Sequence, residues 1–210
     1  MKKLLVISHE RSGTHFLMDT LALNFGYCSK PWYDIDPDNI RNPYYAANIK
    51  SALADFVGKG CNVIFKTHYP ADFFNDIKDF MLKEFTIIYI YRSVDDCLKS
   101  LQKHLEVLPW KAGPEVKDPH AFAFCPPSGG LLRYQMRQHG SLLERHYAHH
   151  KGYAPWFPEI THINYNFLDQ AFEEAVRFIA ESARLDLLQD LPVRPERNDI
   201  NERFKNDKVR

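Results

Sequence analysis

LLVISHERSGTHF, at residues 4–16, is the stretch of sequence that decides the fold. Residues 4–8 form a mainly apolar run that predicts a buried strand. Apolar side chains then recur at helical spacing from Thr14 until Gly26, which predicts a helix directly after the strand. A Gly-containing turn between strand and helix leaves the first helical N–H groups unpaired, and these donors together with the helix dipole bind anions. The stretch therefore predicts a phosphate-binding turn.

The turn differs from the P-loop of ATP- and GTP-using enzymes, in which two glycines frame four residues and precede a Lys and a Ser or Thr. Here Gly13 takes the place of the second glycine, Thr14 that of the Lys, and His15 that of the residue that holds magnesium. Arg11 instead lies inside the turn, where its planar guanidinium can reach a phosphate or a group bonded to it. For this turn taken alone, an ordinary strand-to-helix connection with a surface Arg is the alternative.

Composition limits the class of protein. A length of 210 residues favours one domain, over residues 1–210, with a substantial core. The chain has 27 basic and 27 acidic residues, so it carries no global charge that would attract nucleic acid or an anionic membrane. The four cysteines contain no C-x-x-C pair, which argues against a zinc site or a disulfide framework. We therefore expect no nucleic-acid partner, no membrane partner and no metal; the sequence does not specify an oligomeric state.

The N-terminal apolar run ends after Ile7 and is too short for the core of a signal peptide. The sequence also has no run of about 18 apolar residues that would span a bilayer. These features predict a soluble, cytoplasmic protein.

Two later strands also deliver charged side chains. Residues 62–65 predict a strand that leads into Lys66 and His68, and residues 85–91 predict a strand that ends at Arg92. Ligands of an open α/β sheet bind beyond the carboxyl ends of its strands, so these side chains and the first turn should face one crevice. The predicted fold class is α/β: a single-domain, P-loop-like fold of three layers, with a central, mostly parallel sheet of about four to five strands flanked by helices.

A helix should begin after the third strand, because Ser93 and Asp96 have the spacing of an N-terminal capping box. Ser100 lies on the same face of that helix as Ser93. Its hydroxyl can therefore point back to the group that Arg92 binds.

The remaining segments are assigned from composition and periodicity. Helices are expected at residues 46–57, 73–83, 131–150 and 168–185. Residues 28–45 and 105–130 are expected to be loops on the substrate side, and residues 186–210 a C-terminal tail. Aromatic side chains in residues 28–45 either line a pocket or cover the edge of the core. An apolar acceptor pocket is indicated by Trp110, Phe122, Phe124, Trp156 and Phe157.

Three histidines, His146, His149 and His150, end the expected helix at residues 131–150. No Asp, Glu or Cys completes a ligand set for a metal. We therefore interpret them as a charged, exposed helix end.

Three motifs now follow strand ends: Arg-Ser-Gly-Thr from Arg11, Lys-Thr-His-x-Pro from Lys66, and Tyr-Arg at Arg92 with Ser100 eight residues later. In order and spacing they resemble the sulfotransferases that use 3′-phosphoadenosine 5′-phosphosulfate (PAPS). The resemblance extends over residues 4–183. It is weaker at Glu10, where the family usually has proline, and in the C-terminal part, which has no Arg-Lys-Gly segment.

The resemblance implies a role for each motif. The 5′-phosphosulfate would be held by Arg11, Ser12, Gly13, Thr14 and His15. Phe16 and Tyr165 would contact adenine, and Arg92 and Ser100 the 3′-phosphate. Tyr165 is the weaker assignment, since Asn166 and Phe167 replace the acidic pair of the family. Arg194 and Arg197 would replace the missing C-terminal contact, with a solvated tail as the alternative.

The implied reaction is in-line sulfuryl transfer to a small hydroxylated acceptor, a phenol or an alcohol. His68 would act as the general base, while Lys66 and Arg11 would stabilise the charge that develops without a metal. The sequence leaves open a small-molecule kinase with a degenerate phosphate loop, a carbohydrate or glycolipid sulfotransferase, and a nucleotide binder without turnover.

Overall fold

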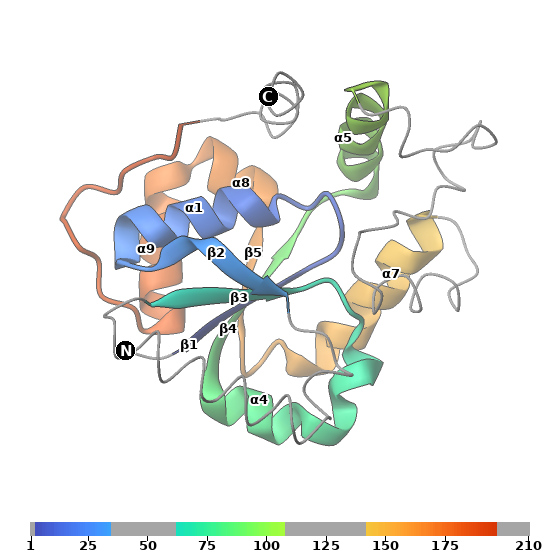
Figure 1. Cartoon of the computed structure of the whole chain (residues 1–210), viewed down its shortest axis with the longest axis horizontal. Helices are drawn as coiled ribbons and strands as arrows, with labels where there is room; N and C mark the ends of the chain where they lie inside the picture. The colour runs from blue at the N-terminus through green and yellow to red at the C-terminus, as the bar shows by residue number, and fades with distance from the viewer. Residues whose placement is uncertain (1–2, 35–61, 108–141, 197–210) are drawn as a thin grey trace.

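A computed structural model describes residues 3–34, 62–107 and 142–196 of the chain (Figure 1). Its centre is a five-stranded sheet in the order β2-β3-β1-β4-β5, and every neighbouring pair is parallel. The strands are β1 (Lys3–Ser8), β2 (Cys28–Asp34), β3 (Val63–Thr67), β4 (Phe85–Tyr91) and β5 (Thr161–Asn164). The α/β fold with a parallel central sheet is therefore confirmed. The helix expected at residues 46–57 lies outside the described residues.

Helices cover both faces of the sheet (Figure 1). On one face lie α1 (Thr14–Phe25), α8 (Tyr165–Gln170) and α9 (Phe172–Ala183), packed against Leu4 and Val6 of β1. On the other face lie η1 (Ala71–Ile77), α4 (Lys78–Glu84), α7 (Leu142–Tyr153) and η3 (Ala154–Trp156), packed against Leu5 and Ile7. Because successive side chains of a strand point to opposite faces, a strand buried on both sides is apolar throughout.

Several expected boundaries are wrong. Residues 28–34 form β2 instead of a loop, and among the strands of the described residues β2 is the edge strand, a position at which proline is tolerated. The helix expected at residues 168–185 is two helices that are separated at Ala171. The helix that begins after Ser93, α5 (Val94–Val107), extends into the loop expected at residues 105–130, the rest of which is outside the described residues.

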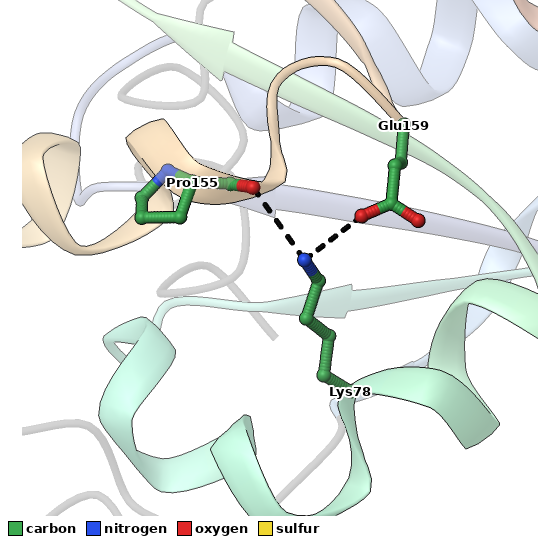
Figure 2. Close-up of polar contacts among 3 residues, drawn as sticks. All are labelled: Lys78, Pro155 and Glu159. Carbon is green, nitrogen blue, oxygen red and sulfur yellow. Dashed lines mark hydrogen bonds and ion pairs between the residues drawn. The ribbon is translucent and has the colours of Figure 1, made fainter.

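The helix expected at residues 73–83 is also different, since its first half is the 3-10 helix η1. Its second half, α4, is joined to the segment after α7 by Lys78 (Figure 2). The Lys78 Nζ donates to the carboxylate of Glu159 at 2.9 Å and to the carbonyl of Pro155 at 3.5 Å. It also lies 5.6 Å from the centre of the Trp156 ring. These contacts hold the helices of this face to each other.

The described part of the C-terminal segment, residues 186–196, is mostly exposed but is fixed to α1 by hydrogen bonds. Asn24, fully buried in α1, is the anchor. Its side-chain amide donates to the carbonyl of Val193 at 2.8 Å, and its Oδ1 accepts from the N–H of Val193 at 2.6 Å. The N–H of Leu188 donates to the Asn24 carbonyl at 2.9 Å. None of the helices among the described residues is long and apolar enough to cross a membrane.

We predict that Asn24→Ala lowers the free energy of unfolding by about 2 kcal/mol, because it removes both hydrogen bonds between the fully buried Asn24 side chain and the backbone of Val193. Urea denaturation measures this change. Leu23→Ala, at a 44% exposed position of the same helix, is the matched control and should change stability by less than about 0.5 kcal/mol. Equal losses in both variants would contradict the anchoring role of Asn24.

Candidate active site

The connection between β1 and α1 forms a tight turn. The N–H of Ser12 donates to the carbonyl of His9 at 3.3 Å, and both Arg11 (φ 64°) and Gly13 (φ 93°) adopt the left-handed conformation. In the described residues no side chain caps the N-terminus of α1 at Gly13. The positive end of a twelve-residue helix is therefore available to an anion at the place that the sequence predicted.

Tyr165, the first residue of α8, lies directly against this turn. A Cβ atom at position 13 would overlap the Tyr165 ring, so the position requires glycine for space as well as for its positive φ. Phe16 meets the same ring edge to face, with 6.0 Å between ring centroids. The two aromatic residues that the resemblance assigned to adenine thus lie together beside the turn.

Arg92, directly after β4, stacks on the Tyr165 ring with its guanidinium carbon 4.2 Å from the ring centroid. Its Nε is buried and has no hydrogen-bond partner in the part of the chain that the structure describes. A buried donor without a partner is costly, and an anionic ligand would satisfy it. This donor and the N-terminus of α1 are two separate places at which an anion could be bound.

Arg11 contacts α5. Its Nε and one terminal nitrogen donate to the Ser100 hydroxyl at 3.2 and 2.9 Å, and the same terminal nitrogen donates to the Ser100 carbonyl at 3.2 Å. Next to this contact, the hydroxyl of Ser12 lies 3.8 Å from the sulfur of Cys97. The structure thus joins two residues that the resemblance assigned to different phosphates of the nucleotide.

His68, directly after β3, is held by Ser8 at the end of β1. Its Nδ1 lies 2.9 Å from the Ser8 carbonyl and 3.1 Å from the Ser8 hydroxyl. The pKa of His68 is lowered to about 3, mainly because the ring is buried and secondly because the positive charge of Lys66 is nearby. His68 is therefore a neutral imidazole at pH 7, and the residue as a whole is half-buried. The side chain of Lys66 is itself 7% exposed.

The other residues that the sequence assigned to the site lie in the described part of the chain, except Arg197. Ser12 and Thr14 are buried in the turn, and His15 is close enough to His68 for its charge to lower the pKa of that imidazole. Arg194 forms an ion pair with Asp169, and its guanidinium carbon lies 5.6 Å from the centre of the Phe16 ring. Arg197 is outside the described residues.

A cluster of three histidines, two of them buried, adjoins His68, and sequence reasoning missed it. His9 packs against His146 and His149 of α7, with ring centroids 4.9 and 5.6 Å apart. His149 is 1% exposed and shares a 3.0 Å hydrogen bond with the hydroxyl of Tyr89. The expectation of an exposed helix end is therefore wrong for His149. The available signal was the spacing of His149, Tyr153 and Trp156 on one helical face, since all three are buried.

Burial lowers the pKa of all three imidazoles, and that of His9 to about 3. The Nε2 atoms of His146 and His149 are buried without a hydrogen-bond partner among the described residues. In those residues no group of three or more side chains has the arrangement of a metal site. The cluster is thus a neutral, polar wall beside the carboxyl ends of β1 and β4.

These features define a class: a parallel α/β protein with an anion-binding turn after its central strand and a second cation at a neighbouring strand end. Solved structures share this architecture. The chain resembles mouse sulfotransferase SULT7A1 complexed with PAP, with a TM-score of 0.52, 14% identity, and coverage of 90% of this chain and 61% of that chain. It also resembles retinol dehydratase in complex with androsterone and inactive cofactor PAP, with a TM-score of 0.48, 17% identity, and coverage of 88% and 63%.

The likeness to the mouse sulfotransferase shows that the chain shares its fold. The chain spans less than two thirds of the length of either structure. No protein-family model matches the sequence, and no curated protein matches it.

We predict that the protein loses stability as the pH falls from 6.5 towards 3. Buried imidazoles such as His149 stay neutral in the folded state, whereas in the unfolded chain they bind protons below about pH 6.5. The unfolded state then binds more protons, so its free energy falls relative to that of the folded state. In His149→Gln the slope of unfolding free energy against pH should decrease by about 1.4 kcal/mol per pH unit. Urea denaturation from pH 8 to pH 5 measures this slope.

The measurement at pH 8 is the control, because His149 is neutral there in both states. A difference between wild type and variant at pH 8 reports lost contacts alone. An unchanged slope in the variant would show that His149 becomes charged in the folded protein.

Proposed function

We propose that this protein is an enzyme that transfers the sulfuryl group of PAPS to the hydroxyl of a small acceptor. The observation that carries the proposal is that a neutral imidazole and two guanidinium groups belong to the segments that follow the carboxyl ends of three adjacent strands. The sheet register pairs Ile7 with Thr67 and Ser8 with Ile90, so the segments that follow β1, β3 and β4 begin at the same edge. His68, Arg11 and Arg92 come from these segments.

The residues that would bind the nucleotide are those of the turn and its neighbours. The N-terminus of α1 with Ser12, Gly13, Thr14 and His15 would hold the 5′ end. Arg92 and Ser100 would hold the 3′-phosphate, with Arg194 or Arg197 as a further contact to it, and Phe16 and Tyr165 would contact the adenine. When bound, the nucleotide supplies an activated sulfuryl group on a phosphate that leaves as an anion and needs no proton.

His68 would remove the proton of the acceptor hydroxyl. The Ser8 carbonyl can only accept, so Nδ1 carries the ring hydrogen and Nε2 is the basic nitrogen. Lys66 would stabilise negative charge beside the reacting oxygen. Arg11, whose planar guanidinium carries several N–H donors, would contact the 5′-phosphosulfate.

The acceptor proposed is a small phenol or alcohol, in a cytoplasmic protein that needs no metal. Trp156 does not support this choice of acceptor. The sequence indicated that it lines an apolar acceptor pocket, but it is 1% exposed and belongs to the core. Trp110, Phe122 and Phe124 lie outside the described residues. A phenol, with a pKa near ~10, yields its proton to a neutral imidazole more readily than an aliphatic alcohol and is the first acceptor to test.

His68→Asn should lower the rate of sulfuryl transfer by at least about 100-fold and leave the Kd for adenosine 3′,5′-bisphosphate (PAP) within about threefold. The Asn side-chain amide can still donate to the Ser8 carbonyl, so the fold around the turn is kept, while the basic nitrogen is lost. Transfer from labelled PAPS and calorimetric titration with PAP measure the two quantities. Loss of transfer and of PAP binding together would show a structural role of His68.

A second prediction separates sulfuryl transfer from the activity of a kinase. Excess EDTA should leave transfer from PAPS unchanged, because the protein's own cations take the place of a metal between the phosphates. A kinase would lose its activity, since magnesium bridges the phosphates of its nucleotide. Phosphoryl transfer from ATP that depends on magnesium, without transfer from PAPS, would contradict the proposed function.

A further inference from the structure

Three polar side chains from three elements form a continuous chain of hydrogen bonds inside the protein. His68 Nδ1 lies 3.1 Å from the hydroxyl of Ser8, and that hydroxyl lies 2.6 Å from the hydroxyl of Thr14. Ser8 is fully buried at the end of β1, and Thr14 is 5% exposed at the start of α1. The chain therefore runs from the candidate base to the first residue of the anion-binding helix.

The direction of this chain follows from the number of hydrogens. Because Nδ1 of His68 donates to the Ser8 carbonyl, it cannot accept from the Ser8 hydroxyl. The hydrogen of that hydroxyl is then available only to Thr14, at a distance typical of a strong O–H···O bond. Because the Thr14 hydroxyl accepts from Ser8, its own hydrogen can be donated to a group other than these three side chains. An anion at the N-terminus of α1 is such a group.

We propose that Ser8 is a positioning residue that couples the base to the nucleotide: an anion bound at Thr14 acts through Ser8 on His68 and makes its Nε2 a stronger base. This inference rests on the proposed function. An anion that accepts from Thr14 strengthens the bond from Ser8 to Thr14, and the Ser8 oxygen then accepts more strongly from Nδ1–H. A stronger bond at Nδ1 favours the protonated ring. The base thus becomes effective only when the nucleotide is bound.

The groups around His68 disfavour a proton on its ring, which is why the base requires such a coupling. The titratable groups that face its ring are Lys66 on β3, His15 on α1, His9 in the turn and His149 on α7. Each of them, when charged, opposes a proton on the ring, and burial acts in the same direction. The bound anion is the compensating charge, and the hydroxyl of Ser8 connects its site to Nδ1.

Nuclear magnetic resonance tests the inference without turnover. In the wild-type protein with labelled histidine, addition of PAP at pH 7 should move the Nδ1–H resonance of His68 downfield. In Ser8→Ala the shift should be absent, because the link to Thr14 is removed. Ser8→Thr is the matched control, since it keeps the hydroxyl, and it should keep the shift. An equal shift in Ser8→Ala and wild type would overturn the proposal.

The pH dependence of kcat/KM for the acceptor, at saturating PAPS, is the second readout. Without the coupling, His68 is a weaker base, so in Ser8→Ala the plateau should fall about tenfold and the acid limb should move about one pH unit lower. A merely structural role would lower the rate at every pH and leave the limb in place. If Ser8→Ala does not fold, Thr14→Val interrupts the chain at its other end and should give the same displaced limb.

Failure of the inference differs from failure of the proposed function. If wild type transfers sulfate from PAPS but Ser8→Ala keeps both its limb and its resonance shift, the coupling is wrong and the function stands. If wild type neither binds PAP nor transfers sulfate, the proposed function is wrong. The resonance experiment with inorganic pyrophosphate then still tests the coupling through Ser8, because the coupling requires only an anion at the turn. Absence of a shift in wild type would overturn the coupling.

Discussion

Burial of β1 on both faces is the constraint on which the rest of the structure depends. Its residues 4–7 are fully buried between two layers of helices, and the strand lies between β3 and β4. All three strands are parallel, so the segments after them begin at one edge of the sheet. Were β1 shifted by one residue, its side chains would exchange faces and both core clusters would be disrupted. The packing that stabilises the core therefore also determines the positions of Ser8, His68 and Arg92.

Much of this arrangement could be predicted from sequence, because its signals are local. The apolar runs of β1 and β4, the glycines at both ends of α1 and the box formed by Ser93 and Asp96 each determine structure within a few residues. The strand β2 carried no such signal, since it is placed in the sheet by pairing with β3, which lies about 30 residues later in the chain. The burial of His149 depends on Tyr89, 60 residues earlier in the chain, and the anchoring of the C-terminal segment depends on Asn24, 169 residues before Val193. Such contacts appear only once the chain is folded.

The candidate site concentrates polar groups where burial makes them costly. His9, His146 and His149 are held neutral, and two of their ring nitrogens have no partner among the described residues. Apolar residues of similar size would pack there at lower cost, so stability alone does not account for this composition. Neutral imidazoles beside His68 add polarity without adding positive charge at pH 7. They therefore leave the candidate base neutral without surrounding it by a purely apolar wall.

Arg11 links the shape of the turn to the position of α5. A non-glycine residue in the left-handed conformation costs about 1 kcal/mol or more, and here the contacts of its guanidinium to Ser100 offset that cost. These contacts exist only when α5 is docked on the turn. The start of α5 is in turn held by Asp96, whose carboxylate accepts from Ser93 at 2.7 Å and from Asn166 of α8 at 3.5 Å. Since an anion at the N-terminus of α1 requires this same turn, its binding and the docking of α5 must stabilise each other.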